Sequence, residues 1–69
     1  MELQDWLKME RLSACQFKDR HGHIVVIRRL RMDLFEITDG GEVTGTASAL
    51  GVLRHYDRYA PVFPVFEDD

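Results

Sequence analysis

The residues best suited to chemistry lie close together in the first third of the chain: Cys15, Asp19, His21 and His23. Thiolate, carboxylate and imidazole groups are all ligands that zinc accepts. A zinc site needs three or four ligands, usually from two recurring pairs, and no second pair follows in the sequence. We therefore expect no metal site and no cofactor. The histidines are expected in a solvent-exposed turn, where imidazoles titrate near neutral pH.

The same group contains the only candidate for a catalytic nucleophile, Cys15 beside a histidine. Nothing in the sequence supplies a third group to orient such a pair or a glycine-rich oxyanion loop. Gly40, Gly41 and Gly45 do not match a phosphate-binding loop, because no Gly-Lys-Ser/Thr motif follows them. The sequence therefore predicts no catalytic residues and a protein that is not an enzyme.

Basic residues are concentrated between positions 18 and 31, at Lys18, Arg20, Arg28, Arg29 and Arg31. Arginines gathered on a sheet contact phosphates or base edges in nucleic-acid-binding proteins. The formal net charge of −3 argues against that function, because nucleic-acid-binding domains are usually basic. Charged residues also protect edge strands from unwanted pairing. A nucleic-acid-binding module with an arginine patch on the sheet is therefore the alternative prediction.

The strongest structural signal is the apolar run of residues 24–27, Ile-Val-Val-Ile. A strand here places two large apolar side chains on each face of its sheet. A half-buried strand would alternate apolar and polar residues, so this run predicts that both faces are covered. Because no glycine or proline interrupts residues 24–37, two architectures fit the stretch. We favour two strands joined by a tight turn near residues 29–32, since strands usually span about 5–6 residues; one long bent strand would suit a small SH3-like or Sm-like barrel.

The flanking segments predict a domain of the α+β class. Leu3, Trp6 and Leu7 share one face of a short helix over residues 2–12. Strands are expected at 14–18, at the central run, at 32–38 and at 42–46, with turns at 19–22 and 39–41 and a second helix at 46–59. The predicted fold is a short N-terminal helix, a three- or four-stranded antiparallel meander, a C-terminal helix and an extended apolar tail.

The tail, residues 61–69, contains two prolines, which make it extended and confine any pairing to an edge strand. We expect its apolar residues to pack back on the domain. The 69 residues form one domain, 1–69, that buries only about 60% of its unfolded surface, so its core is marginal. The lone cysteine and the lack of a signal-peptide or membrane-span pattern predict a cytoplasmic protein that does not enter a membrane.

These features predict a small non-catalytic binding protein, a regulator or inhibitor of the bacterial or phage accessory type. A doubly apolar strand and an apolar tail exceed what so short a chain covers, so we expect a protein partner or a homodimer. The candidate partner-binding residues are Trp6, Arg28, Arg29, Arg31, Phe63 and Phe66. For Trp6 the competing interpretation is a core residue that packs the first helix on the sheet.

Overall fold

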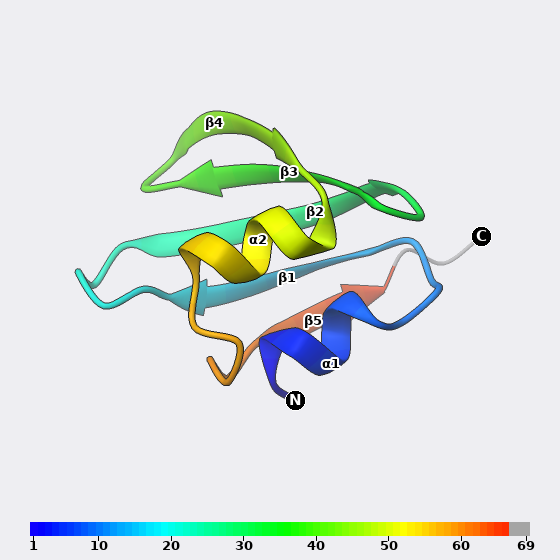
Figure 1. Cartoon of the computed structure of the whole chain (residues 1–69). Helices are drawn as coiled ribbons and strands as arrows, with labels where there is room; N and C mark the ends of the chain where they lie inside the picture. The colour runs from blue at the N-terminus through cyan, green and yellow to red at the C-terminus, as the bar shows by residue number, and fades with distance from the viewer. Residues whose placement is uncertain (67–69) are drawn as a thin grey trace.

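The computed structural model describes residues 1–66 and shows a five-stranded antiparallel sheet with two helices on one of its faces (Figure 1). The elements in chain order are α1 (Leu3–Leu7), β1 (Ser13–Lys18), β2 (Ile24–Arg31), β3 (Leu34–Asp39), β4 (Glu42–Ala47), α2 (Ala49–His55) and β5 (Phe63–Phe66). Across the sheet the strand order is β4-β3-β2-β1-β5. The first four strands form a meander, and β5 returns to pair with β1. The predicted α+β class is confirmed.

Two glycine-containing turns set how the meander strands pair. Gly22 has a φ of 82° in the β1–β2 turn, and Gly40 and Gly41 have φ values of 61° and 90° in the β3–β4 turn. Positive φ at both central positions suits a two-residue hairpin whose twist matches that of the strands. The turn at residues 32–33 joins β2 to β3, and the register of that pair places Val25 of β2 opposite Asp39 of β3. The end of β3 therefore lies beside the beginning of β2.

The central stretch forms two strands, not one bent strand. β2 ends at Arg31, and β3 begins at Leu34 after a turn at residues 32–33. The pairing also shifts between Arg29 and Arg31, so Leu30 is the extra residue of a bulge. Within residues 1–66 the sheet is open, with β4 and β5 at its edges. The alternative of an SH3-like or Sm-like barrel does not describe this part of the chain.

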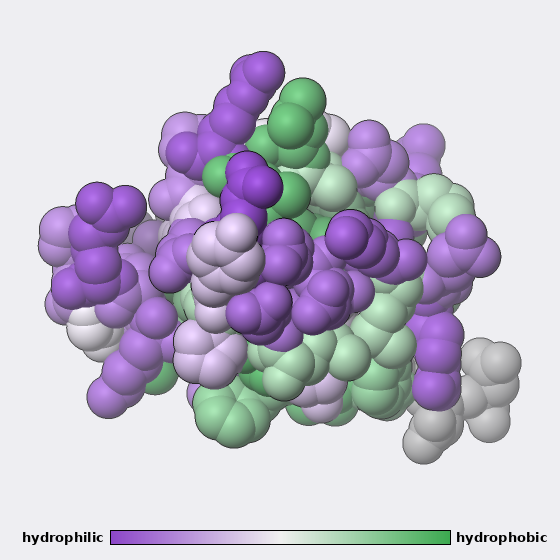
Figure 2. All heavy atoms as spheres, turned by 60° about the horizontal axis from the view of Figure 1, so that its bottom comes forward, coloured by the Kyte–Doolittle hydropathy of each residue, from purple (hydrophilic) through white to green (hydrophobic). Residues whose placement is uncertain are grey.

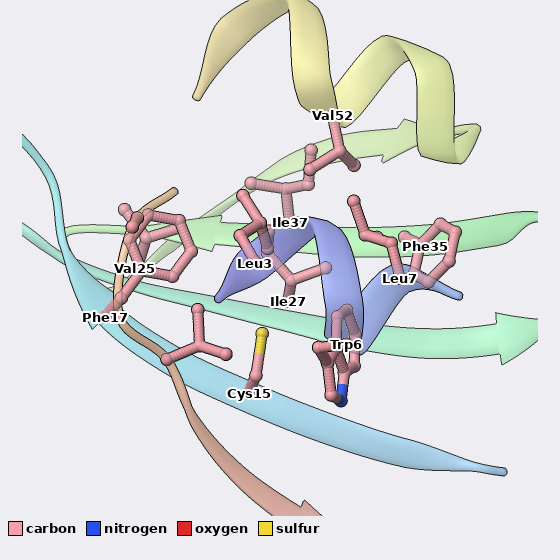
Figure 3. Packing of buried hydrophobic residues seen from close by; sticks show 12 residues of the cluster. Leu3, Trp6, Leu7, Cys15, Phe17, Val25, Ile27, Phe35, Ile37 and Val52 are labelled. Carbon is pink, nitrogen blue, oxygen red and sulfur yellow. The ribbon is translucent and has the colours of Figure 1, made fainter. Parts of the chain in front are cut away.

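Alternate strand residues point to an inner face that is covered by both helices. Leu3 and Trp6 from α1 and Val52 from α2 are fully buried against this face (Figure 3). The inner strand residues of this core are Cys15, Phe17, Val25, Ile27, Phe35 and Ile37. Because apolar burial is the dominant favourable term in folding, this single layer between the helices and the sheet holds the domain together.

The prediction that both faces of residues 24–27 are covered is wrong for a single chain. Val25 and Ile27 are fully buried, whereas Ile24 is 41% exposed and Val26 is only partly buried. Both helices lie in front of the sheet in Figure 1, and no described element crosses behind it. Four consecutive apolar residues therefore do not mark a strand that this chain buries on both sides.

Both helices are shorter than the sequence predicts. α2 begins after Ser48, whose Oγ accepts a hydrogen bond from Gly51 N–H at 3.2 Å, and it ends at His55. Downstream, an Asp57 carboxylate oxygen accepts from Tyr59 N–H at 2.9 Å, a local turn that competes with helix formation. Neither helix of residues 1–66 has the length and apolar character needed to cross a membrane.

The tail returns to the domain as an edge strand. Val62 is buried, and β5 pairs with β1 so that Phe63 lies opposite Gln16 and Val65 opposite Ala14. An edge position is where a strand tolerates a proline, here at position 64. Phe63 and Val65 nevertheless remain largely exposed. Residues 67–69 of the predicted tail lie outside the described residues.

Candidate binding surfaces

Every strand contributes side chains to the face of the sheet that points away from the helices. We refer to it as the outer sheet face. The strand registers align Phe63, Gln16, Val26, Thr38 and Val43 in one row across it, and Val65, Ala14, Arg28, Glu36 and Thr46 in the next. Ile24 also belongs to this face because it precedes inward-pointing Val25. Apolar and polar groups thus alternate across a surface that spans the whole sheet.

Several apolar side chains on the outer sheet face are open to solvent. The exposed fractions are 72% for Phe63, 67% for Val65, 63% for Val43 and 41% for Ile24. They lie on both edge strands and on the central strand, so exposure is not confined to one loop or terminus. Exposed apolar side chains mixed with polar groups are typical of a protein-binding surface.

The predicted arginine patch is divided between the two faces, because Arg29 points inward and is only 4% exposed. Its guanidinium carbon lies 4.7 Å from the ring centroid of Phe35 and 5.9 Å from that of Trp6. Nη2 donates to the carbonyl oxygen of Leu7 at 2.9 Å, and Nη1 donates to that of Met32. Arg29 therefore ties the end of α1 to the β2–β3 turn and lies out of reach of a surface ligand.

The other predicted partner-binding residues have mixed positions. Arg28 lies on the outer sheet face opposite Glu36, and Arg31 is exposed beside the bulge. Phe66 lies opposite Ser13 at the inner side of the edge, half-buried, with the Arg11 guanidinium carbon 4.5 Å from its ring centroid.

Trp6 belongs to the core and not to a surface. It is fully buried, its ring centroid lies 5.6 Å from that of Phe35, and its Nε1 donates to Ser13 Oγ at 2.9 Å. Trp6 is therefore a core residue that packs the first helix on the sheet. Of the six predicted residues, Arg28 and Phe63 lie on the outer sheet face. Val65, Val43 and Ile24 were missed, although the two-residue periodicity of β5 places Val65 beside Phe63.

A second group of functional side chains meets at the end of the sheet where the β1–β2 and β3–β4 turns lie. We refer to Asp19, His23 and Asp39 as the Asp-His-Asp cluster. His23 Nδ1 lies 3.7 Å from Asp19 Oδ2 and 3.5 Å from Asp39 Oδ1. Hydrophilic residues dominate the left end of Figure 2, which is the end that holds the β1–β2 turn. The cluster combines one imidazole with two carboxylates from separate hairpins.

Hydrogen bonds fix the orientation of both carboxylates. Asp19 Oδ1 accepts from the N–H groups of His21 and His23 at 2.8 and 2.9 Å. Desolvation opposes ionisation of Asp19, but these two donors and the neighbouring imidazoles outweigh it and lower its pKa. Tyr56 OH donates to Asp39 Oδ2 at 3.4 Å. Desolvation, followed by the negative charge of Asp39, raises the pKa of Tyr56, so its hydroxyl keeps its proton near neutral pH.

Cys15 does not join Asp19 and the histidines in the structure, although these residues are close together in the sequence. Cys15 is buried in the core, and desolvation raises the pKa of its thiol to about 12, only partly offset by a hydrogen bond with the Ile27 backbone. The thiol is therefore unsuited to act as a nucleophile or ligand. Asp39 takes its place beside His23 and was missed, because it lies far along the chain. The β2–β3 register, across the turn at residues 32–33, brings Asp39 there, and Gly40 N–H donates to Ile24 O at 3.0 Å.

An open cleft adjoins the Asp-His-Asp cluster on the helix-covered side of the sheet. Its walls come from the β1–β2 turn, β4 and the end of α2, and they include Asp19, His21, Asp39 and Tyr56. Comparison with known protein families, curated proteins and solved structures finds no match to this chain. Its function is therefore inferred from the arrangement of its residues.

Proposed function

We propose that this chain is a small non-catalytic binding protein that recognises a protein partner through the outer sheet face. One observation carries the proposal: both helices cover the inner face, while Phe63, Val65 and Val43 remain more than half exposed on the other. These residues belong to paired strands, so they are held in place before binding. A rigid apolar surface loses little conformational entropy when a partner covers it.

The energetics favour a partner that covers the β5 side of this face. Full burial of one Phe or Val side chain contributes about 1.5–3 kcal/mol. The cross-strand neighbours of Phe63 and Val65 on β1 are Gln16 and the small Ala14. Phe63 is therefore the proposed anchor, with Val65 beside it and Arg28 supplying a polar contact in the next row.

We propose no catalytic role for this chain. A protein with such a surface acts by covering a surface of its partner, as a regulator or inhibitor does. We place it inside the cell, where a reduced Cys15 is compatible with the reducing environment. A second copy of the chain is the competing occupant of the same face. The nucleic-acid alternative is weakened by Arg29, because its burial removes the central member of the arginine patch.

The test compares two apolar residues with similar exposure on different surfaces. Phe63→Asp places a charge on the outer sheet face, and Leu50→Asp does so on α2, where Leu50 is 62% exposed. Wild type and both variants are immobilised and incubated with lysate of the source cell. A protein retained by wild type and Leu50→Asp, but lost with Phe63→Asp, supports the proposal; equal retention by all three contradicts it. Sedimentation over a concentration series identifies the competing homodimer.

A further inference from the structure

The Asp-His-Asp cluster brings three donor atoms from three segments to one point. Asp19 directly follows β1, His23 directly precedes β2, and Asp39 is the last residue of β3. Asp19 Oδ2, His23 Nδ1 and Asp39 Oδ1 all lie within 4.8 Å of one another. The outer sheet face plays no part in this arrangement, so the two surfaces can be tested separately.

The distances within the cluster differ from those of a hydrogen-bonded pair. An N–H···O hydrogen bond spans about 2.7–3.2 Å between its heavy atoms. His23 Nδ1 lies 3.5 Å from one carboxylate oxygen and 3.7 Å from the other. The imidazole thus lies within ion-pair distance of both carboxylates but beyond hydrogen-bond distance of either.

This spacing matches that of neighbouring ligands on one metal ion. Zinc binds imidazole nitrogen and carboxylate oxygen at about 2.0–2.2 Å, so neighbouring ligands of a tetrahedral ion are about 3.4 Å apart. The two distances to His23 Nδ1 are close to that value. Calcium and magnesium select oxygen ligands, so the imidazole favours a transition metal.

The surroundings of the cluster are also those of a metal site. The second oxygen of Asp19 accepts two backbone N–H groups, and that of Asp39 accepts the hydroxyl of Tyr56. Outer hydrogen bonds of this kind orient the ligands of bound metals. The oxygens that face His23 are the ones left without a protein hydrogen bond among the described residues.

We propose that Asp19, His23 and Asp39 bind one divalent transition-metal ion of the zinc class. The three protein ligands leave further coordination positions for water. The ion links the β1–β2 turn to the end of β3, and it therefore stabilises the folded chain by mass action. The competing interpretation is a protonated His23 that interacts with both carboxylates without a metal.

The experiment uses the full chain without an affinity tag, stripped of metal by a chelator. Zn²⁺ binding is measured by calorimetry, and Co²⁺ binding by visible absorption, which reports the ligand geometry. The ligand variants are His23→Gln and Asp39→Asn, and His21→Gln is the matched control because His21 is an exposed neighbour outside the triad. Circular dichroism establishes that each variant is folded, and Mg²⁺ is titrated for comparison.

We expect one Zn²⁺ per chain, a higher Tm with Zn²⁺ than with Mg²⁺, and loss of both effects in the two ligand variants. His21→Gln should retain the wild-type affinity within about twofold, while Tyr56→Phe should weaken it by about tenfold, as for other outer-sphere partners. Absence of Zn²⁺ binding to wild type overturns the proposal in favour of the protonated cluster. Equal losses in His21→Gln and His23→Gln also overturn it. Phe63→Asp should bind Zn²⁺ normally, which separates this test from that of the partner-binding face.

Discussion

The two faces of one sheet differ although the same strands build both. In β2, Val25 and Ile27 are fully buried beneath the helices, while their neighbour Ile24 is 41% exposed. The inner face even holds a charged side chain, Arg29, and the outer sheet face leaves an aromatic ring, that of Phe63, in solvent. Residue type alone therefore does not assign a side chain to the core. The position of the two short helices decides which face of the sheet is shielded from solvent.

Truncating one aromatic residue on each side gives the largest expected contrast. Trp6→Ala should lower the free energy of unfolding by about 4 kcal/mol, because it leaves a core cavity and removes the buried hydrogen bond from Trp6 Nε1 to Ser13 Oγ. Phe63→Ala should change it by less than about 1 kcal/mol, since the ring is already largely exposed. Urea unfolding of both variants measures the difference. Similar losses would show that Phe63 is buried in solution.

Adjacent arginines test the same contrast for charged groups. Arg29→Ala should destabilise the fold by about 3 kcal/mol, because the carbonyls of Leu7 and Met32 lose a charged donor and two aromatic contacts disappear. Arg28→Ala should alter stability by about 0.5 kcal/mol or less, as is usual for an exposed charge. Thermal unfolding checks both values. A larger loss for Arg28 than for Arg29 would reverse the assignment of faces.

Placing a hydroxyl at two consecutive valines sharpens the comparison at near-constant volume. Val25→Thr inserts an unpaired hydroxyl into the core and should destabilise the protein by about 2 kcal/mol. Val26→Thr exposes its hydroxyl on the outer sheet face and should have an effect below about 0.5 kcal/mol. Chemical denaturation of the two variants is the measurement. Equal effects would indicate that both faces are covered, as in an obligate dimer.

The buried thiol provides a smaller, pH-dependent test of the inner face. Desolvation raises the pKa of Cys15 from 9.0 to about 12, against a lowering by the Ile27 backbone. Above pH 9 the unfolded chain loses this proton while the folded chain keeps it, so rising pH favours unfolding. The contribution of the protonated Cys15 thiol to the free energy of unfolding is fully present below pH 9. Above pH 9 it is lost by at most about 1.4 kcal/mol per pH unit.

Stability measured between pH 8 and about 10.5 should therefore fall more steeply for wild type than for Cys15→Ala. Subtracting the two curves removes the contribution of Tyr56, whose pKa is also raised and which both proteins share. Parallel curves would mean that the thiol is accessible to solvent. Slow reaction of native Cys15 with a thiol reagent provides an independent measure of its burial.

Much of the fold was predictable because local chemistry determines it. Gly22 and the Gly40–Gly41 pair mark turns with positive φ, and two prolines confine the tail to an edge strand. The covered side of residues 24–27 was not predictable. Four consecutive apolar residues show that both faces are apolar, but they do not show how many helices are available to cover them.

The candidate sites were harder to predict because they depend on long-range register. Asp39 reaches His23 only because Val25 lies opposite it, and Arg29 turns inward while Arg28 turns outward on the same strand. Arginines that are clustered in the sequence predict one patch, but the alternation of side chains along a strand divides them between the two faces of the sheet. Trp6 fitted both a core and an interface, and only the packing of α1 on the sheet distinguished them.

Methyl NMR with a soluble paramagnetic probe tests the central claim most directly, that one face of the sheet is open and receives a protein partner. Alone, the methyl groups of Ile24, Val43 and Val65 should be broadened by the probe, while those of Val25 and Ile27 should be protected. Added partner should protect the first set and leave the second unchanged. If Ile24, Val43 and Val65 stay equally broadened in the presence of saturating partner, the outer sheet face is not the binding surface.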